Sequence, residues 1–275
     1  MTSPINRKSS EWCYENTAGL LADQFNNSWI WIIEPSSMHD HIFSRYDNFV
    51  HGNLLGAPES FDNHGALQHL KELLKAGVDL VNHHLEGQEH EQVARLDNDD
   101  EVSQSSASDQ NSISSSVQVQ CQVKHDLPLV LVGFSKGCVV LNQFLHELAD
   151  VESSTTPELK NFVASISAWY WLDGGHSKET NTWITDEDVL VELATLKTKI
   201  NVHVTPYQMS DPSRPYIGEE ERVFVDTLKR LGADVTETLH FDGQTRSLKI
   251  HFRVLERIFD TECNPINFPA QFDKK

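Results

Sequence analysis

The sequence predicts an α/β fold in which a mostly parallel sheet is covered by helices on both faces. From residue 127 onward, short strand-like runs alternate with longer runs whose apolar residues recur at helical spacing. The first of the strand-like runs, LPLVLVGF at residues 127–134, is apolar almost throughout, as expected of a strand buried between two layers of helices. Parallel strands need crossover connections, which the intervening helices supply. At 275 residues the chain is long enough to bury one large core in such a three-layer domain.

Three elements are expected in the N-terminal part of the chain. Residues 15–25, ENTAGLLADQF, place leucines and a phenylalanine on one side of an amphipathic helix. Residues 28–34, SWIWIIE, are almost wholly apolar, which is typical of a strand covered on both faces. Residues 64–80 repeat leucine and valine at the spacing of a second helix.

The next segment differs sharply in composition. From about residue 86 to residue 125 the chain is acidic and serine-rich, with almost no large apolar side chains. Such a segment cannot bury enough apolar surface to offset the entropy lost on ordering it. We therefore expect a disordered insertion within a single domain spanning residues 1–275, and its acidic residues offer a surface to protein partners.

The remainder of the chain supplies the strands and helices of the predicted sheet. The expected strands cover residues 127–134, 161–174, 200–208 and 234–241. The expected helices follow the first of these strands directly and cover residues 186–197, 218–231 and 248–259 further on.

The charge balance excludes several classes of protein. The formal net charge is -19, from 41 acidic and 22 basic side chains, so binding of nucleic acid through a basic patch is not expected. No apolar run reaches the roughly 18 residues needed for a transmembrane helix.

Residues 83–91, HHLEGQEHE, lack the spacing of a helical zinc site, and we expect neither a metal nor a cofactor. The N-terminus lacks a clear targeting signal, which predicts a cytoplasmic location.

The strongest chemical signal is the pentapeptide Gly-Phe-Ser-Lys-Gly at residues 133–137. It joins a predicted strand to a predicted helix with no spare residues, which is the setting of a nucleophile elbow. There the serine adopts a strained backbone conformation that exposes its hydroxyl, and the flanking glycines avoid clashes with the strand and helix. Ser135 is therefore the expected nucleophile, and the backbone N–H of Lys136 is an expected donor to an oxyanion.

A serine hydroxyl needs a base, and the base needs an acid to orient it. In an α/β-hydrolase arrangement the three follow in the order serine, acid, histidine, after successive strands. Asp211 follows the strand at 200–208, and His251 lies beyond the strand at 234–241. Order and placement therefore favour Ser135, Asp211 and His251 as a triad.

Other residues compete for these roles. Asp173 ends the preceding strand, a position at which it serves as the alternative acid. His240 lies within a strand pattern, which favours a packed core residue over a base. His176 follows two glycines near the functional edge of the sheet and is a candidate for lining the pocket.

Longer motifs carry a resemblance to a known family. They read GFSKGCVVLNQ, YWLDGGHS, VHVTPYQMSDPSRPYIG and HFRV, with SRYDNFVHGNLLGAPE in the N-terminal half. Together they resemble the eukaryotic family named after the human chromosome 2 open reading frame 69 protein, over most of residues 11–85 and 127–254.

The resemblance implies an α/β-hydrolase-like fold and a serine hydrolase of poorly defined substrate, with Ser135, Asp211 and His251 at the family's triad positions. It implies a mitochondrial location, whereas the N-terminal sequence predicts a cytoplasmic one. It also implies a further strand before the helix at 15–25, which this sequence is expected to lack together with a second oxyanion donor. The leading hypothesis is an esterase, thioesterase or lipase-like enzyme acting through an acyl-enzyme. The alternative is a catalytically weak or inactive interaction protein on the same fold.

Overall fold

The computed structural model describes four stretches of the chain, which are residues 12–99, 122–153, 156–176 and 180–259. The chain divides into two compact units, one made of Met1–His69 with Pro128–Lys275 and the other of Leu70–Leu127. The sheet and the candidate site belong to the first unit. The expectation of one domain with an insertion stays a prediction.

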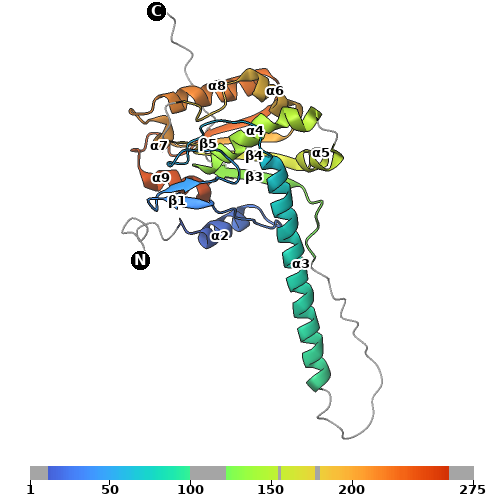
Figure 1. The fold of residues 1–275 in the computed structure, drawn as a ribbon. Coiled ribbons are helices and arrows are strands. Elements are labelled where there is room, and N and C mark those ends of the chain that lie inside the picture. The colour runs from blue at the N-terminus through green and yellow to red at the C-terminus, as the bar shows by residue number, and fades with distance from the viewer. Residues whose placement is uncertain (1–11, 100–121, 154–155, 177–179, 260–275) are drawn as a thin grey trace, which may run out of the picture. The chain divides into compact units, whose positions relative to one another are not determined.

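The centre of the first unit is a sheet of four parallel strands in the order β3-β4-β5-β6 (Figure 1). The strands are β3 (Leu129–Phe134), β4 (Ile166–Leu172), β5 (Lys199–Val204) and β6 (Asp234–Leu239). Each overlaps the run predicted for it, so the predicted α/β class and the parallel sheet are confirmed.

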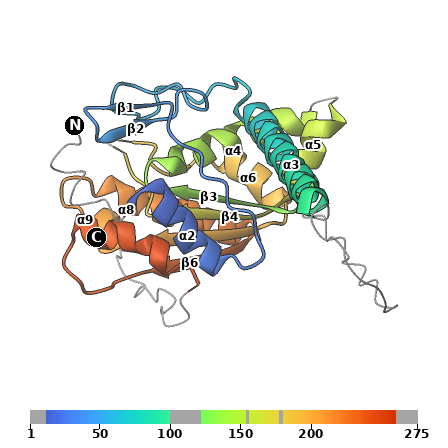
Figure 2. The same ribbon diagram turned by 90° about the horizontal axis from the view of Figure 1, so that it is seen from below.

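Helices cover both faces of this sheet. One face carries α4 (Gly137–Ser153), α6 (Glu187–Thr195) and α8 (Tyr216–Arg230), and the other carries α2 (Tyr14–Gln24), α9 (Leu248–Arg253) and the 3-10 helix η3 (Val254–Glu256). Figure 2 shows α2 and α9 on the near side of the strands. Two short helices complete the layer connections, α5 (Pro157–Ala164) before β4 and α7 (Pro206–Met209) after β5.

Side chains of β4 alternate between the two layers. Trp171 contacts Phe224 of α8, with ring centroids 5.3 Å apart. Tyr170 and Leu172 point to the opposite side, where they pack in a cluster with Leu21 of α2 and residues of η3. Because alternate residues of one strand are buried under different helices, β4 is covered on both faces. The two tryptophans of this strand, Trp169 and Trp171, are fully buried core residues.

The predicted strand at residues 28–34 is wrong. In the described part of the chain this run is assigned to no strand, and the parallel sheet ends at β3. Ile30 and Ile32 pack beside the cluster under β4, whereas Trp29 is 45% exposed. An apolar run indicates burial, but strand formation also needs a partner for the backbone N–H and C=O groups. The run instead leads into the hairpin of β1 (Ser37–His39) and β2 (Phe43–Arg45).

The long helix α3 (Ala66–Asp99) passes from the first unit into the second. It continues beyond the helix predicted at 64–80 and includes the first residues of the predicted insertion. Within the second unit, the Asn82 amide donates to the Val123 carbonyl at 2.9 Å and accepts from the Val123 N–H at 2.8 Å. Residues 100–121 lie outside the described residues, and their predicted disorder stays a prediction.

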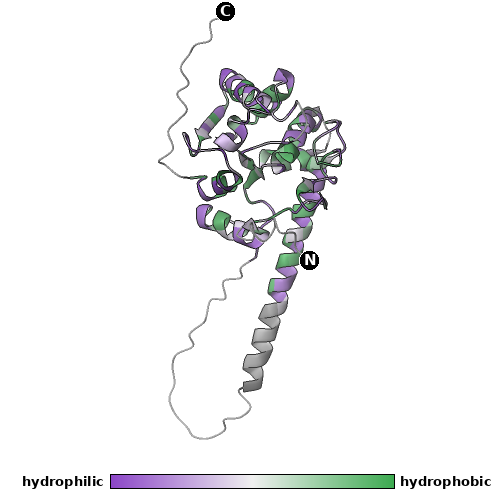
Figure 3. Cartoon of the chain, turned by 90° about the vertical axis from the view of Figure 1, so that its left-hand side faces the viewer, coloured by the Kyte–Doolittle hydropathy of each residue, from purple (hydrophilic) through white to green (hydrophobic). Residues whose placement is uncertain are grey.

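Hydrophilic and hydrophobic residues are mixed along the described helices, including the upper turns of α3 (Figure 3). Among the described residues, no helix is both long enough and apolar enough to cross a membrane.

Candidate active site

Ser135 occupies the sharp turn between β3 and α4. Its φ angle is 52°, in the left-handed region that non-glycine residues rarely adopt. Its N–H donates to the Leu172 carbonyl of β4 at 2.9 Å, and its carbonyl accepts from the Cys138 N–H at 3.1 Å. These bonds hold a backbone conformation that costs free energy, as found for serines on strand-to-helix elbows.

The two glycines of the pentapeptide have different roles. A Cβ on Gly133 would lie 2.8 Å from a Leu141 methyl carbon and 3.0 Å from the Cys138 backbone, so no larger residue fits there. A Cβ on Gly137 would meet no atom within 4 Å. Gly133 therefore permits the close approach of α4 to β3, whereas Gly137 is not required by sterics.

His251 forms a hydrogen-bonded pair with Asp173. His251 Nδ1 lies 2.7 Å from Asp173 Oδ2, and both side chains are buried. Because a carboxylate only accepts hydrogen bonds, the proton of a neutral imidazole lies on Nδ1 in this pair, which leaves the Nε2 lone pair free to act as a base.

Thr205, the residue after β5, holds the same carboxylate. Its N–H donates to Asp173 Oδ1 and its hydroxyl donates to Asp173 Oδ2, both at 2.7 Å. Asp173 itself has a φ of 48°, so the backbone turns sharply as it leaves β4. Three donors therefore fix a carboxylate that has no exposure to solvent.

Aromatic rings place His251 next to the elbow. Its ring centroid lies 4.7 Å from that of Phe134, the residue before Ser135, and 4.6 Å from that of Tyr207. Among the described residues, no hydrogen bond joins the Ser135 hydroxyl to His251. Such bonds are often long in the absence of substrate and tighten when it binds.

The structure pairs His251 with Asp173 and not with Asp211, which corrects the expected acid–histidine pairing. Asp211 instead accepts from Ser213 and from two guanidinium groups, those of Arg214 at 2.8 Å and Arg246 at 2.5 Å. The physical reason is the short helix α7, which separates Asp211 from the end of β5. Burial opposes ionisation of Asp211, but the hydrogen bonds from Ser213 and Arg214 prevail and lower its pKa to about 2.

The backbone N–H of Lys136 stands at the start of α4, where N–H groups have no partner within the helix. Its side chain runs to another loop, where Nζ donates to the Leu55 carbonyl and lies 5.6 Å from the centre of the Phe43 ring. Burial lowers the pKa of this ammonium group to about 8. Lys136 thus links the elbow to the loop after β2, a contact that the sequence did not predict.

Comparison with known proteins adds the family. The C2orf69 family model matches residues 2–234. This chain belongs to the C2orf69 family. It is 40% identical to the mitochondrial protein C2orf69 homolog of Mus musculus over 267 residues, which cover 92% of this chain and 72% of the relative. It is 39% identical to the mitochondrial protein C2orf69 of Homo sapiens over 269 residues, or 92% of this chain and 68% of the relative.

The homologue of Danio rerio, also named a mitochondrial protein, is 40% identical over 245 residues, covering 89% of this chain and 64% of the relative. No solved structure matches the chain. The resemblance predicted from the long motifs is therefore confirmed.

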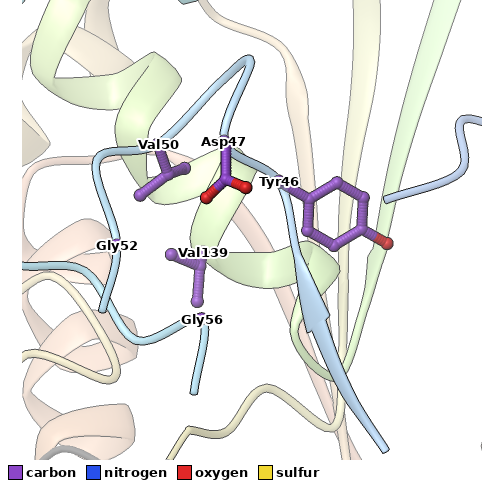
Figure 4. A pocket seen from close by; sticks show the side chains of 6 residues that line it. All are labelled: Tyr46, Asp47, Val50, Gly52, Gly56 and Val139. Atoms are coloured by element: carbon purple, nitrogen blue, oxygen red, sulfur yellow. The ribbon is translucent and has the colours of Figure 1, made fainter. Parts of the chain in front are cut away.

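A small cavity lies between the loop after β2 and the first turn of α4 (Figure 4). Its volume is about 10 Å³, which is room for about one water molecule, and an ester substrate does not fit. It is lined by Tyr46, Asp47, Val50, Gly52, Gly56 and Val139.

The other two histidines singled out from the sequence, His176 and His240, have structural contacts. His176 is buried, its Nε2 lies 3.0 Å from the Asn181 carbonyl, and its own carbonyl accepts from Arg214. His240 is buried beside His203, with 2.8 Å between His240 Nε2 and His203 Nδ1, as expected of a packed core residue. Burial and the neighbouring His240 lower the pKa of His203 to about 3. The described residues contain no group of three or more His, Cys, Asp or Glu that could hold a metal ion.

Sequence reasoning missed the residues that support the pair in this C2orf69 family member, above all Thr205 and Tyr207. A signal for Thr205 was present, because it lies toward the carboxyl end of the strand predicted at 200–208, and that strand pairs with β4, which directly precedes Asp173. Residues at the carboxyl ends of neighbouring parallel strands lie close together. No local signal marks Tyr207, since its contact with His251 joins residues far apart in sequence.

Proposed function

We propose that this protein is a serine hydrolase with an α/β-hydrolase-like fold that cleaves an ester or thioester. Ser135 is the nucleophile, His251 the base and Asp173 the acid that orients it. One observation carries the proposal, the buried Asp173–His251 pair beside a serine with positive φ. The order serine, acid, histidine along the chain would require the acid after the serine, and Asp173 meets that condition.

In the proposed reaction, His251 Nε2 takes the hydroxyl proton as Ser135 Oγ bonds to the substrate carbonyl carbon. The carbonyl electron pair moves to oxygen, and the resulting oxyanion accepts from the Lys136 N–H. When the oxyanion collapses, the bond to the alcohol or thiol breaks, and the leaving group takes the proton from His251. Water then attacks the acyl-serine by the same steps, releasing the acid and restoring Ser135.

The first turn of α4 supports the oxyanion role. The positive end of its helix dipole points at the turn that carries Ser135 and favours negative charge there. Loss of a single oxyanion donor typically lowers a rate by about 10²–10³-fold. If the Lys136 N–H is the sole donor, the lack of a second donor would lower the rate by about this factor.

We infer a mitochondrial location. The relatives from mouse, human and zebrafish are all named mitochondrial proteins, and these names favour the mitochondrion over the cytoplasm predicted from the N-terminus. Fractionation of cells expressing the tagged full-length protein, followed by protease protection, tests this location. Recovery of the protein in the cytosol alone would refute it.

Labelling with a fluorophosphonate probe tests the enzyme proposal, because the probe bonds to a serine hydroxyl activated by its own base. We expect the wild-type protein to be labelled, and Ser135→Ala and His251→Ala to remain unlabelled. Ser153→Ala is the matched control, since Ser153 is exposed at the far end of the same helix. Equal labelling of Ser135→Ala and wild-type protein would overturn the assignment.

The alternative is an interaction protein on this fold with weak or no catalysis, binding partners through its acidic segment. Two observations favour it, the absence of a Ser135–His251 hydrogen bond among the described residues and the small size of the cavity beside α4. Well-folded wild-type protein that the probe does not label would support this alternative.

A further inference from the structure

We propose that Asp211 is a positioning residue that holds both His251 and the loop of Asp173 in place through two arginines. The inference rests on the proposed function, because positioning matters only if His251 acts on Ser135. It gives Asp211 a role that involves no contact with the histidine.

Asp211 is 4% exposed, and each of its oxygens has two donors. Oδ1 accepts from the Ser213 N–H at 3.0 Å and the Ser213 hydroxyl at 2.6 Å. Oδ2 accepts from Arg214 Nε at 2.8 Å and Arg246 Nη2 at 2.5 Å. Two guanidinium groups repel each other, so their approach at one oxygen depends on the negative charge of Asp211.

One arm of this arrangement leads to His251. Arg246 Nε donates to the Tyr207 carbonyl at 2.9 Å, and its guanidinium lies 4.8 Å from the centre of the Tyr207 ring. The Tyr207 ring also contacts His251, with ring centroids 4.6 Å apart. Arg246 also precedes Ser247, whose side chain caps α9, the helix that carries His251. Fixing the position of Arg246 therefore also fixes the start of α9 and the Tyr207 ring that packs against His251.

The other arm leads to Asp173. Arg214 Nη2 donates to Gln208 Oε1 at 3.1 Å, and Gln208 Nε2 lies 3.4 Å from the Asp173 carbonyl. A Cβ on Gly175 would lie 2.2 Å from Gln208 Nε2, so the loop after Asp173 is shaped around this amide. One buried carboxylate thus supports the segments that carry both members of the acid–histidine pair.

The test is the rate of Ser135 labelling as a function of pH in Asp211→Asn, Arg246→Gln and the double variant, compared with Asp173→Asn. For a positioning role, Asp211→Asn lowers the plateau rate by about 10- to 100-fold and leaves the pH midpoint unchanged, because Asp173 still contacts the imidazole. The double variant should lose no more than the worse single variant, since both break one linkage. Asp242→Asn is the control that should label normally, because Asp242 is exposed and lies in the same loop as Arg246.

Two results would overturn the inference. A pH midpoint that moves in Asp211→Asn as it does in Asp173→Asn would make Asp211 the acid. Unchanged labelling of Asp211→Asn, with only a lower melting temperature, would make its role purely structural. If Asp211→Asn fails to fold, the labelling of Arg246→Gln alone tests the inference. Arg246 is exposed, and Asp211 keeps its ion pair with Arg214 in that variant, so the protein is expected to fold.

The failure of the proposed function would look different, because wild-type protein would then show no Ser135-dependent labelling. Hydrogen exchange still tests the linkage in that case. Arg246→Gln should speed exchange in residues 242–251 and leave residues 130–134 of β3 unchanged. Equal exchange of residues 242–251 in wild-type and variant protein would refute the linkage.

Discussion

The Nδ1 atom of His251 lies 2.7 Å from Oδ2 of Asp173, 78 residues away in the chain. Asp173 is the first residue after β4, and His251 lies in α9, which packs against the opposite side of the sheet from α4. The pair forms because the chain crosses from one layer to the other between these two residues. A buried carboxylate that accepts three hydrogen bonds is fixed firmly enough to fix the imidazole.

The first prediction concerns Asp173→Asn. The amide can donate to Nδ1 and thereby select the tautomer whose proton lies on Nε2, which cannot act as a base. We expect the rate of Ser135 labelling to fall by about 10⁴-fold, the size seen when a serine triad loses its acid in this way. Circular dichroism should show a folded protein, and labelling within a few fold of wild type would rule out Asp173 as the acid.

The second prediction concerns Thr205, whose hydroxyl bonds to Asp173 and caps α7. Thr205→Val keeps the shape and the N–H but removes the hydroxyl. We expect the free energy of unfolding to fall by about 1–2 kcal/mol and labelling to slow, because a buried carboxylate loses a donor. Thr205→Ser should restore both quantities, and chemical denaturation measures the first. A valine variant as stable as wild type would show that the hydroxyl contributes nothing.

The third prediction separates the two glycines of the elbow. Gly133→Ala places a methyl group 3.0 Å or less from Leu141 and Cys138, so we expect insoluble or strongly destabilised protein. Gly137→Ala meets open space at the first residue of α4 and should raise the free energy of unfolding by about 0.5–1 kcal/mol. Thermal melting of both variants checks the contrast, which equal effects would contradict.

The fourth prediction uses the lowered pKa of Lys136, which burial moves from 10.5 to about 8. Between these two values the unfolded chain binds more protons than the folded protein, so stability rises as the pH increases through this window. Lys136→Met removes the effect. The unfolding free energy of wild type minus that of the variant should therefore increase from pH 7.5 to pH 10. No change in this difference would show that the ammonium group is well solvated.

How far the sequence predicted this structure depends on the range of each interaction. The strands and the sharp strand-to-helix turn at Ser135 were predictable, because an apolar run and the Gly133–Gly137 pentapeptide are local patterns. The carboxylate that contacts His251 was not, since Asp173 and Asp211 both follow neighbouring strands. The choice between them depends on α7, whose single turn directs Asp211 toward two arginines.

The run at residues 28–34 shows the same limit from the opposite side. Its composition predicts burial, and its isoleucines do pack against the core. Whether it joins a sheet depends on the pairing of backbone groups with another strand, which composition does not encode.

The last prediction concerns Glu221 of α8, a buried carboxyl group outside the candidate site. Its side chain is 0% exposed, and neither oxygen has a hydrogen-bond partner among the described residues. Burial, with a smaller contribution from Glu237, raises its pKa from 4.5 to about 8. The folded protein therefore holds a proton that the unfolded chain releases above pH 4.5, and stability falls as the pH rises from about 4.5 to 8.

Glu221→Gln keeps the shape of the side chain and removes the titration. We expect the unfolding free energy of the variant minus that of wild type to be larger at pH 8 than at pH 5. Glu219→Gln is the matched control, since Glu219 is exposed on the same helix. Urea denaturation at both pH values measures the change. An equal difference at pH 5 and pH 8 would mean that Glu221 is ionised in the folded protein, with its charge compensated by Arg222 and Lys229, the nearby bases that lower its pKa.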